Sequence, residues 1–108
     1  MDFITLSKWI KKENGRLEKD HGRYSDQDKQ IFACAIKLGE EFGELCQEVL
    51  FHSSLQRKSK MNKFKEENLS GEFADVLITT LLLAQEMNID IEKALEDKIK
   101  KIDKRYEK

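Results

Sequence analysis

The chain has no proline among its 108 residues, and so lacks the residue that most strongly bends or ends a helix. Apolar residues recur every three or four positions through most of the chain, which is the spacing of one face of an α-helix. Polar stretches and glycines divide this pattern into four helical segments. A chain of this length accommodates one domain. The sequence therefore predicts a single all-α domain over residues 1–108, built from four helices.

Residues with strong local preferences set the expected helix ends. Gly22 marks the end of the first helix, and Ser25, followed three residues later by Asp28, predicts the start of the second. Asp90 is a natural N-cap for the last helix. After Asp75 the third helix is apolar almost all round, which is typical of a buried helix. The expected helices cover residues 5–19, 25–52, 68 or 70 to 87, and 91–106, and a polar, basic connector joins the second to the third.

The charge balance limits the classes of partner. Twenty Lys and Arg residues nearly cancel 21 Asp and Glu residues, so the net charge of −1 gives no overall attraction to nucleic acid or anionic lipid. The longest nearly apolar run, residues 76–84, is far shorter than the roughly 20 residues that span a bilayer. The N-terminal segment lacks the apolar core of a secretory signal. We therefore expect a cytoplasmic protein that binds neither nucleic acid nor membranes.

Acidic residues border the apolar stripe of the second expected helix. On a helical projection Glu41, Glu44 and Glu48 lie together, about 90° from the centre of the stripe. A solvated helix face usually explains such a set, and Lys37 offers Glu41 an ion pair one turn away. Taken alone, this helix favours the solvated interpretation.

The third expected helix changes that interpretation. Glu72 and Asp75 stand one turn apart at the start of a helix that is otherwise apolar, where carboxylates have little access to water. If the second and third helices pack antiparallel, these two residues approach Glu41 and Glu44, and each pair of like charges at ~5 Å repels by about 3 kcal/mol. A bound cation would compensate this repulsion. Because the candidate ligands are all carboxylate oxygens, they favour Mg²⁺ or Mn²⁺ over zinc.

The acids form two spaced pairs, E-x-x-E at 41 and 44 and E-x-x-D at 72 and 75. With their context, "KLGEEFGEL", "GEFADVLI" and "ALEDKIKKIDKRY", they resemble the MazG-like all-α nucleoside triphosphate pyrophosphatases. The resemblance implies an enzyme that uses Mg²⁺ to hydrolyse nucleoside or deoxynucleoside triphosphates to the monophosphate and pyrophosphate, as in housecleaning of the nucleotide pool. It implies that the metal ligands and catalytic carboxylates are Glu41, Glu44, Glu72 and Asp75.

The last expected helix carries candidate phosphate ligands. Lys98, Lys101 and Arg105 follow an i, i+3, i+7 spacing and share one face, from which they could neutralise phosphate charge. Basic residues near a helix C-terminus are also often simply solvated, and there their charge interacts favourably with the helix dipole. The resemblance implies that Lys98, Arg105 and Tyr106 face the phosphates and that Lys98 assists catalysis. Trp9 is a candidate for stacking on the nucleobase, with a core position as the alternative.

The length of the second helix predicts association between subunits. About 27 residues span roughly 40 Å at 1.5 Å per residue, whereas a compact globule of this chain length is about 34 Å across. The related enzymes also pair their subunits, so we expect a homodimer, or a dimer of dimers, that completes a four-helix, MazG-like bundle. The alternative function is a non-catalytic helical module that keeps a metal or nucleotide site and acts in regulation or assembly.

Overall fold

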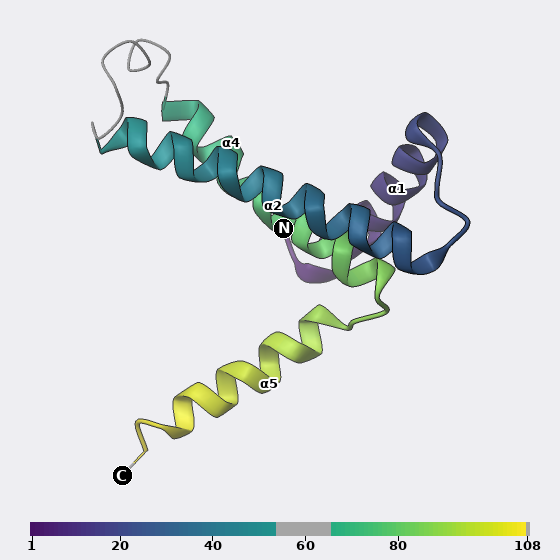
Figure 1. Ribbon diagram of the computed structural model, residues 1–108. Helices are drawn as coiled ribbons and strands as arrows, with labels where there is room; N and C mark the ends of the chain where they lie inside the picture. Colours follow the sequence, from purple (N-terminus) through teal and green to yellow (C-terminus); the bar gives the residue numbers. More distant parts are fainter. Residues whose placement is uncertain (54–65, 108) are drawn as a thin grey trace.

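The computed structural model describes residues 1–53 and 66–107. This part of the chain consists of helices joined by turns and contains no strand, so the predicted all-α class is confirmed (Figure 1). Most of the basic connector lies outside the described residues. None of the described helices combines the length and apolar composition needed to cross a membrane. The helices are α1 (Phe3–His21), α2 (Gln27–His52), α4 (Glu66–Glu86) and α5 (Ile91–Lys104).

An aspartate cap and a glycine define the two ends of α1. The carboxylate of Asp2 accepts a hydrogen bond from the backbone N–H of Thr5 at 2.8 Å, so the helix begins at Phe3, two residues earlier than expected. Gly22 follows the last helical residue with a φ of 75°, a backbone conformation that residues with a Cβ rarely adopt. The predicted stop signal at Gly22 is therefore confirmed.

The start of α2 differs by one residue from the sequence prediction. Ser25 was expected to cap this helix, but the N-cap is Asp26. Its carboxylate accepts hydrogen bonds from the backbone N–H groups of Asp28 at 2.9 Å and Lys29 at 3.2 Å. A carboxylate that serves two of the unpaired donors of a first helical turn is a strong cap, which explains why Asp26 takes this position.

The ends of α4 and α5 agree with the sequence to within a few residues. α4 begins at Glu66, before the expected residue 68 or 70. Asp90 caps α5, as predicted, and its side chain accepts from the backbone N–H of Lys93 at 3.1 Å. Asn88, in the turn between the two helices, has a positive φ of 56°. α5 ends at Lys104, so Tyr106 lies just beyond the helix rather than within it.

α2 and α4 run antiparallel and side by side, and α1 packs against α4 near the beginning of α2 (Figure 1). The most buried apolar side chains are Ile10 of α1, Phe51 of α2, and Leu82 and Ala84 of α4. The core of the described chain is therefore small and follows α4. The antiparallel arrangement is the one that brings the two acidic pairs of the sequence toward each other.

α4 is less buried than its apolar sequence suggests. Leu82 is buried, but Phe73 and Leu77 are 53% and 66% exposed, and Phe42 on the neighbouring α2 is 57% exposed. α1 and α2 cover α4 on two sides and leave another side open. A single chain therefore does not bury α4 on all sides, because the neighbouring described helices do not supply enough cover.

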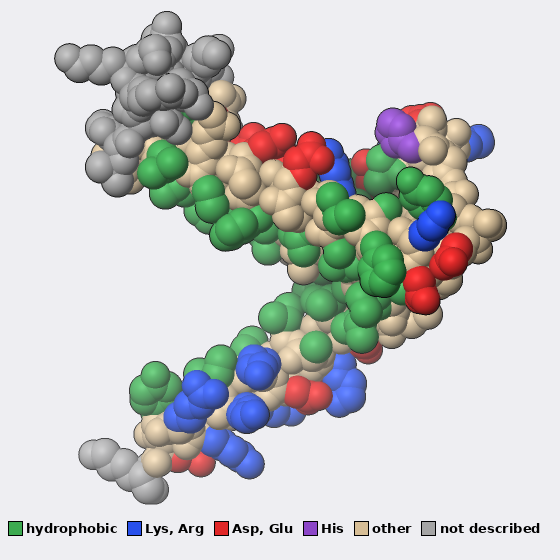
Figure 2. Space-filling view, in the orientation of Figure 1, with side chains coloured by type: hydrophobic (Ala, Val, Ile, Leu, Met, Phe, Trp, Pro, Cys, Tyr) green, Lys and Arg blue, Asp and Glu red, His purple; other side chains and the backbone are tan. Residues whose placement is uncertain are grey.

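α5 extends away from the other helices, and the chain has the shape of an open V (Figure 1). The radius of gyration is 17.1 Å, whereas a compact chain of this length has a value of about 13 Å. Hydrophobic side chains line the edge of α5 that faces the α2/α4 pair, and others line the facing edge of that pair (Figure 2). The four helices of the described residues thus do not close into one bundle within a single chain.

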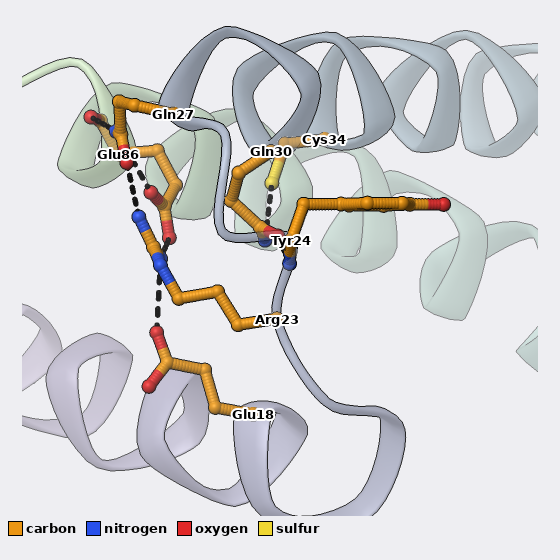
Figure 3. A network of polar contacts seen from close by, with 7 residues as sticks. All are labelled: Glu18, Arg23, Tyr24, Gln27, Gln30, Cys34 and Glu86. Carbon is orange, nitrogen blue, oxygen red and sulfur yellow. Dashed lines mark hydrogen bonds and ion pairs between the residues drawn. The ribbon is translucent and has the colours of Figure 1, made fainter.

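A buried carboxylate ties the turn between α1 and α2 to the end of α4. The side chain of Glu86 is only 2% exposed, and its Oε1 lies 2.7 Å from Nη1 of Arg23 (Figure 3). The same nitrogen lies 3.0 Å from Glu18 of α1, and the side chain of Gln27 donates to the backbone carbonyl of Glu86 at 3.0 Å. The hydrogen bond from Arg23 lowers the pKa of Glu86 despite its burial. An ionised, buried Glu86 therefore fixes the position of this turn.

Candidate metal centre

Three carboxylates from two antiparallel helices converge on one point. Glu41 comes from the middle of α2, and Glu72 and Asp75 come from successive turns near the start of α4. Each offers one oxygen, and these oxygens all lie within 4.8 Å of one another. Carboxylate oxygens at this separation can ligate a single hard cation such as Mg²⁺ or Mn²⁺. We call these three residues the acidic cluster.

The surroundings of the acidic cluster fit a cation. The side chain of Glu41 is 12% exposed and lies 3.4 Å from Nζ of Lys37, which also contacts Glu40. Oε2 of Glu72 is buried and finds no hydrogen-bond partner among the described residues. A buried carboxylate oxygen without a donor loses the stabilisation that it has in water. A cation held by the cluster would satisfy this oxygen.

The negative charges of the cluster and of the neighbouring carboxylates repel one another. Loss of hydration raises the pKa of Glu72, and the negative charges of Glu44, Asp75, Glu41 and Glu48 raise it further. The charge of Glu41, followed by loss of hydration, raises the pKa of Glu44. The contribution of neighbouring carboxylates to both shifts indicates a concentration of negative charge that a divalent cation would offset.

Glu44 and Glu48 extend the cluster along α2. Glu44 lies beside Glu41, although it is not one of the three residues whose oxygens converge. Oε2 of Glu48 is buried and, like that of Glu72, has no hydrogen-bond partner in the described chain. The helical projection of the sequence placed Glu48 on the same face as Glu41 and Glu44, but Glu48 was not among the predicted site residues. Its spacing of four residues from Glu44 was the signal that could have included it.

A cavity of about 380 Å³ adjoins the acidic cluster between α1, α2 and α4. Glu41 and Asp75 line it, together with Lys37. Apolar side chains from α1 and α4, including Leu17 and Ile78, also contribute to its wall. Its size falls within the range of pockets that hold small molecules. The cluster is therefore open to a ligand of about the size of a nucleotide.

The candidate phosphate ligands lie far from the acidic cluster of the same chain. Lys98, Lys101 and Arg105 are exposed at the end of α5, and Tyr106 is 82% exposed. Basic side chains gather on α5, whereas acidic side chains gather on the side of α2 that is turned away from α5 (Figure 2). Within one chain, the structure does not bring these bases to the carboxylates.

Trp9 lies on α1 and is 38% exposed. The guanidinium of Arg16 is 5.7 Å from the centre of its ring, a distance typical of a cation–π contact. Trp9 lines a second, apolar cavity of about 390 Å³ with Leu77 and Leu81, and does not line the cavity beside the acidic cluster. The structure thus places Trp9 apart from the carboxylates, in neither a closed core nor the adjoining cavity.

Comparison with known proteins identifies the family. The model of the family described as MazG-like matches residues 32–108, which include the acidic cluster, Glu44, Glu48 and the bases of α5. Trp9 and the rest of α1 lie outside the match. Comparison with curated proteins and with solved structures gave no match. Because the family model covers more than half of the chain, the protein belongs to the MazG-like family.

Proposed function

We propose that this protein is a metal-dependent hydrolase that cleaves nucleoside or deoxynucleoside triphosphates to the monophosphate and pyrophosphate. The observation that carries the proposal is the convergence of Glu41, Glu72 and Asp75, whose oxygens lie within 4.8 Å of one another beside an open cavity. Membership of the MazG-like family supports nucleotide pyrophosphatase-like chemistry at the level of the family.

The acidic cluster would hold Mg²⁺ or Mn²⁺, with Glu44 beside it. The bound ion would supply positive charge against the phosphate oxygens and make a water molecule more acidic. Glu44 lies next to Glu41 but is not one of the three converging residues, which supports a role for it in orienting the attacking water and accepting its proton. Lys37, whose Nζ lies 3.4 Å from Glu41, lines the same cavity and adds positive charge there.

The substrate phosphates carry more negative charge than one divalent ion neutralises, so further cations belong in the site. Lys98, Lys101 and Arg105 fit this role by charge and by their common face on α5. The α5 helix of the same chain extends away from the acidic cluster (Figure 1). We therefore assign these bases, together with Tyr106, to the cluster of another copy of the chain.

A homodimer, alone or as half of a dimer of dimers, would also complete the core. The apolar stripe of α5 is uncovered, with Leu95, Ile99 and Ile102 between 38% and 55% exposed. Leu77 on α4 is open to solvent as well. Apolar surface of this extent on both walls of the V is typical of a chain that buries it against a partner. A second copy that fills the V would cover both walls.

A pyrophosphate-release assay on a panel of nucleoside and deoxynucleoside triphosphates tests the proposal. We expect turnover with Mg²⁺ or Mn²⁺, none in chelator, and a loss of at least about a hundredfold in Asp75→Asn. Asp20→Asn makes the same chemical change on the exposed surface of α1 and should retain the activity. Metal binding without turnover of any triphosphate would overturn the enzymatic proposal and support the non-catalytic module instead.

A further inference from the structure

The residues that line the cavity beside the acidic cluster indicate which nucleobase it accepts. This inference rests on the proposed function. Glu41 and Asp75 line this cavity, and so does Cys34. Cys34 lies seven positions before Glu41 in α2, about 10 Å along the helix axis at 1.5 Å per residue. This is comparable with the length of a nucleoside. A nucleotide with its phosphates at the cluster would therefore reach the part of the cavity around Cys34 with its base.

The walls around Cys34 are suited to an aromatic ring. Leu17 of α1 and Ile78 and Leu82 of α4 line the cavity and offer apolar surface to the faces of a base. Burial raises the pKa of the Cys34 thiol, so this group is neutral at physiological pH. Selectivity between nucleobases in this part of the cavity must therefore come from the polar groups at its edge.

One of these polar groups is the amide of Gln30. Its Oε1 accepts a hydrogen bond from the backbone N–H of Tyr24 at 3.1 Å, and its Nε2 lies 3.8 Å from Sγ of Cys34 (Figure 3). The contact with Tyr24 sets the orientation of the amide, because only the oxygen can accept from an N–H group. Gln30 therefore presents its NH₂ group, a hydrogen-bond donor, on the side of Cys34.

The second polar group is the carboxylate of Glu18. One of its oxygens lies 3.0 Å from Nη1 of Arg23, and the same nitrogen is anchored 2.7 Å from the buried Glu86 (Figure 3). Arg23 thus holds Glu18 at the edge of the cavity and leaves its second carboxylate oxygen to accept another hydrogen bond. Gln30 and Glu18 line the same cavity, one as a donor and the other as an acceptor.

We propose that this cavity selects nucleotides whose base carries an exocyclic amino group, as cytosine, adenine and guanine do, over those with uracil or thymine. Glu18 accepts from the amino group, Gln30 donates to an acceptor on the same edge of the base, and Arg23 is a positioning residue for Glu18. An ionised carboxylate can only accept hydrogen bonds. The N3–H of uracil and thymine is flanked by two keto oxygens, which a carboxylate at that edge would repel.

Matched nucleotide pairs test this selectivity with the unmodified chain. Deoxycytidine and deoxyuridine triphosphates differ at this edge by an amino or a keto group, as do adenosine and inosine triphosphates. We expect kcat/KM to favour the amino member of each pair by about tenfold or more, the discrimination typical of one well-placed base contact. Equal values within both pairs, or a preference for the keto members, would overturn the inference.

The variant Glu18→Gln tests which residue is responsible. An amide can donate as well as accept, so the variant should lose most of the preference while it keeps its helical circular dichroism spectrum. Asp20→Asn, two residues further along α1 and outside the cavity lining, is the matched control and should keep the preference. An unchanged ratio in Glu18→Gln would remove Glu18 from the recognition site and overturn the inference.

Calorimetric titration with deoxycytidine and deoxyuridine monophosphates separates this inference from the proposed function, because neither compound can release pyrophosphate. Tighter binding of the cytidine compound without turnover of any triphosphate would support the selective cavity while refuting the hydrolase. Turnover of triphosphates with equal binding of the two monophosphates would refute the selective cavity and leave the hydrolase standing.

Discussion

Replacement of Glu72 by Gln should make the chain more stable than the parent when metal is absent. When metal is present, the variant should be less stable than the parent. Glu72 lies within 4.8 Å of both Glu41 and Asp75, measured between single carboxylate oxygens. Two unit charges at this distance repel by about 3 kcal/mol at an effective dielectric constant of 20. Because Glu72 is partly exposed, solvent screens much of this repulsion. We therefore expect Glu72→Gln to raise the free energy of unfolding by about 1–2 kcal/mol in chelator.

Metal should reverse the order of stability. A ligand at one hundred times its Kd stabilises the folded state by about 2.7 kcal/mol. The parent chain should gain this amount in Mg²⁺, and Glu72→Gln should gain much less because it has lost an anionic ligand. The assay is urea denaturation at a fixed chain concentration, in chelator and in Mg²⁺, followed by circular dichroism.

Glu96→Gln makes the same chemical change on exposed α5 and should match the parent chain in both conditions. Two results would refute the reasoning. If Glu72→Gln were less stable than the parent chain in chelator, the carboxylates would not repel as their separation implies. If Mg²⁺ stabilised both chains equally, Glu72 would not be a ligand.

Three further predictions follow from other parts of the molecule. Glu86→Gln should lower the free energy of unfolding at pH 7 by about 1–2 kcal/mol, since the buried Glu86 accepts from charged Arg23. Because Arg23 lowers the pKa of Glu86, the ionised pair stabilises the fold above the ordinary glutamate pKa, and this advantage is lost as the pH falls through the lowered value. Denaturation of both chains at pH 7 and below about pH 4 should show the difference shrink, and a constant difference would contradict the assignment. Lys98→Ala and Arg105→Ala should each lower kcat/KM on the order of tenfold while metal binding without nucleotide stays unchanged; a loss of metal affinity with intact turnover would return both residues to a solvated role. Light scattering during size exclusion at low micromolar concentration should give at least twice the 12.7 kDa chain mass, and an active monomer would refute the homodimer.

The acidic cluster was predictable from sequence because local rules and packing agree there. The two acidic pairs sit on helices whose apolar stripes are strong, and an antiparallel arrangement of such helices brings Glu41 close to Glu72 and Asp75. Glu44 was expected in the same ligand set, yet its oxygens do not converge with the other three. Side-chain spacing on a helix predicts a shared face but not which rotamer each carboxylate adopts.

Other features depended on contacts that a sequence pattern does not encode. The exposure of Phe73 and Leu77 reflects how many helices cover α4, which the apolar sequence of that helix cannot reveal. The placement of α5 away from the cluster was equally hidden, because its stripe predicts an apolar contact without saying whether the same chain supplies it. The contact between Arg23 and Glu86 joins residues 63 positions apart, beyond the reach of any local rule.

The identity of the products tests the central claim most directly. Phosphorus-31 NMR of nucleoside triphosphates incubated with the purified protein distinguishes cleavage between the α and β phosphates from cleavage of the terminal phosphate. With Mg²⁺ we expect equal amounts of nucleoside monophosphate and pyrophosphate, and with chelator or with Asp75→Asn an unchanged triphosphate spectrum. Release of inorganic phosphate and nucleoside diphosphate, or cleavage that continues in chelator, would contradict the account.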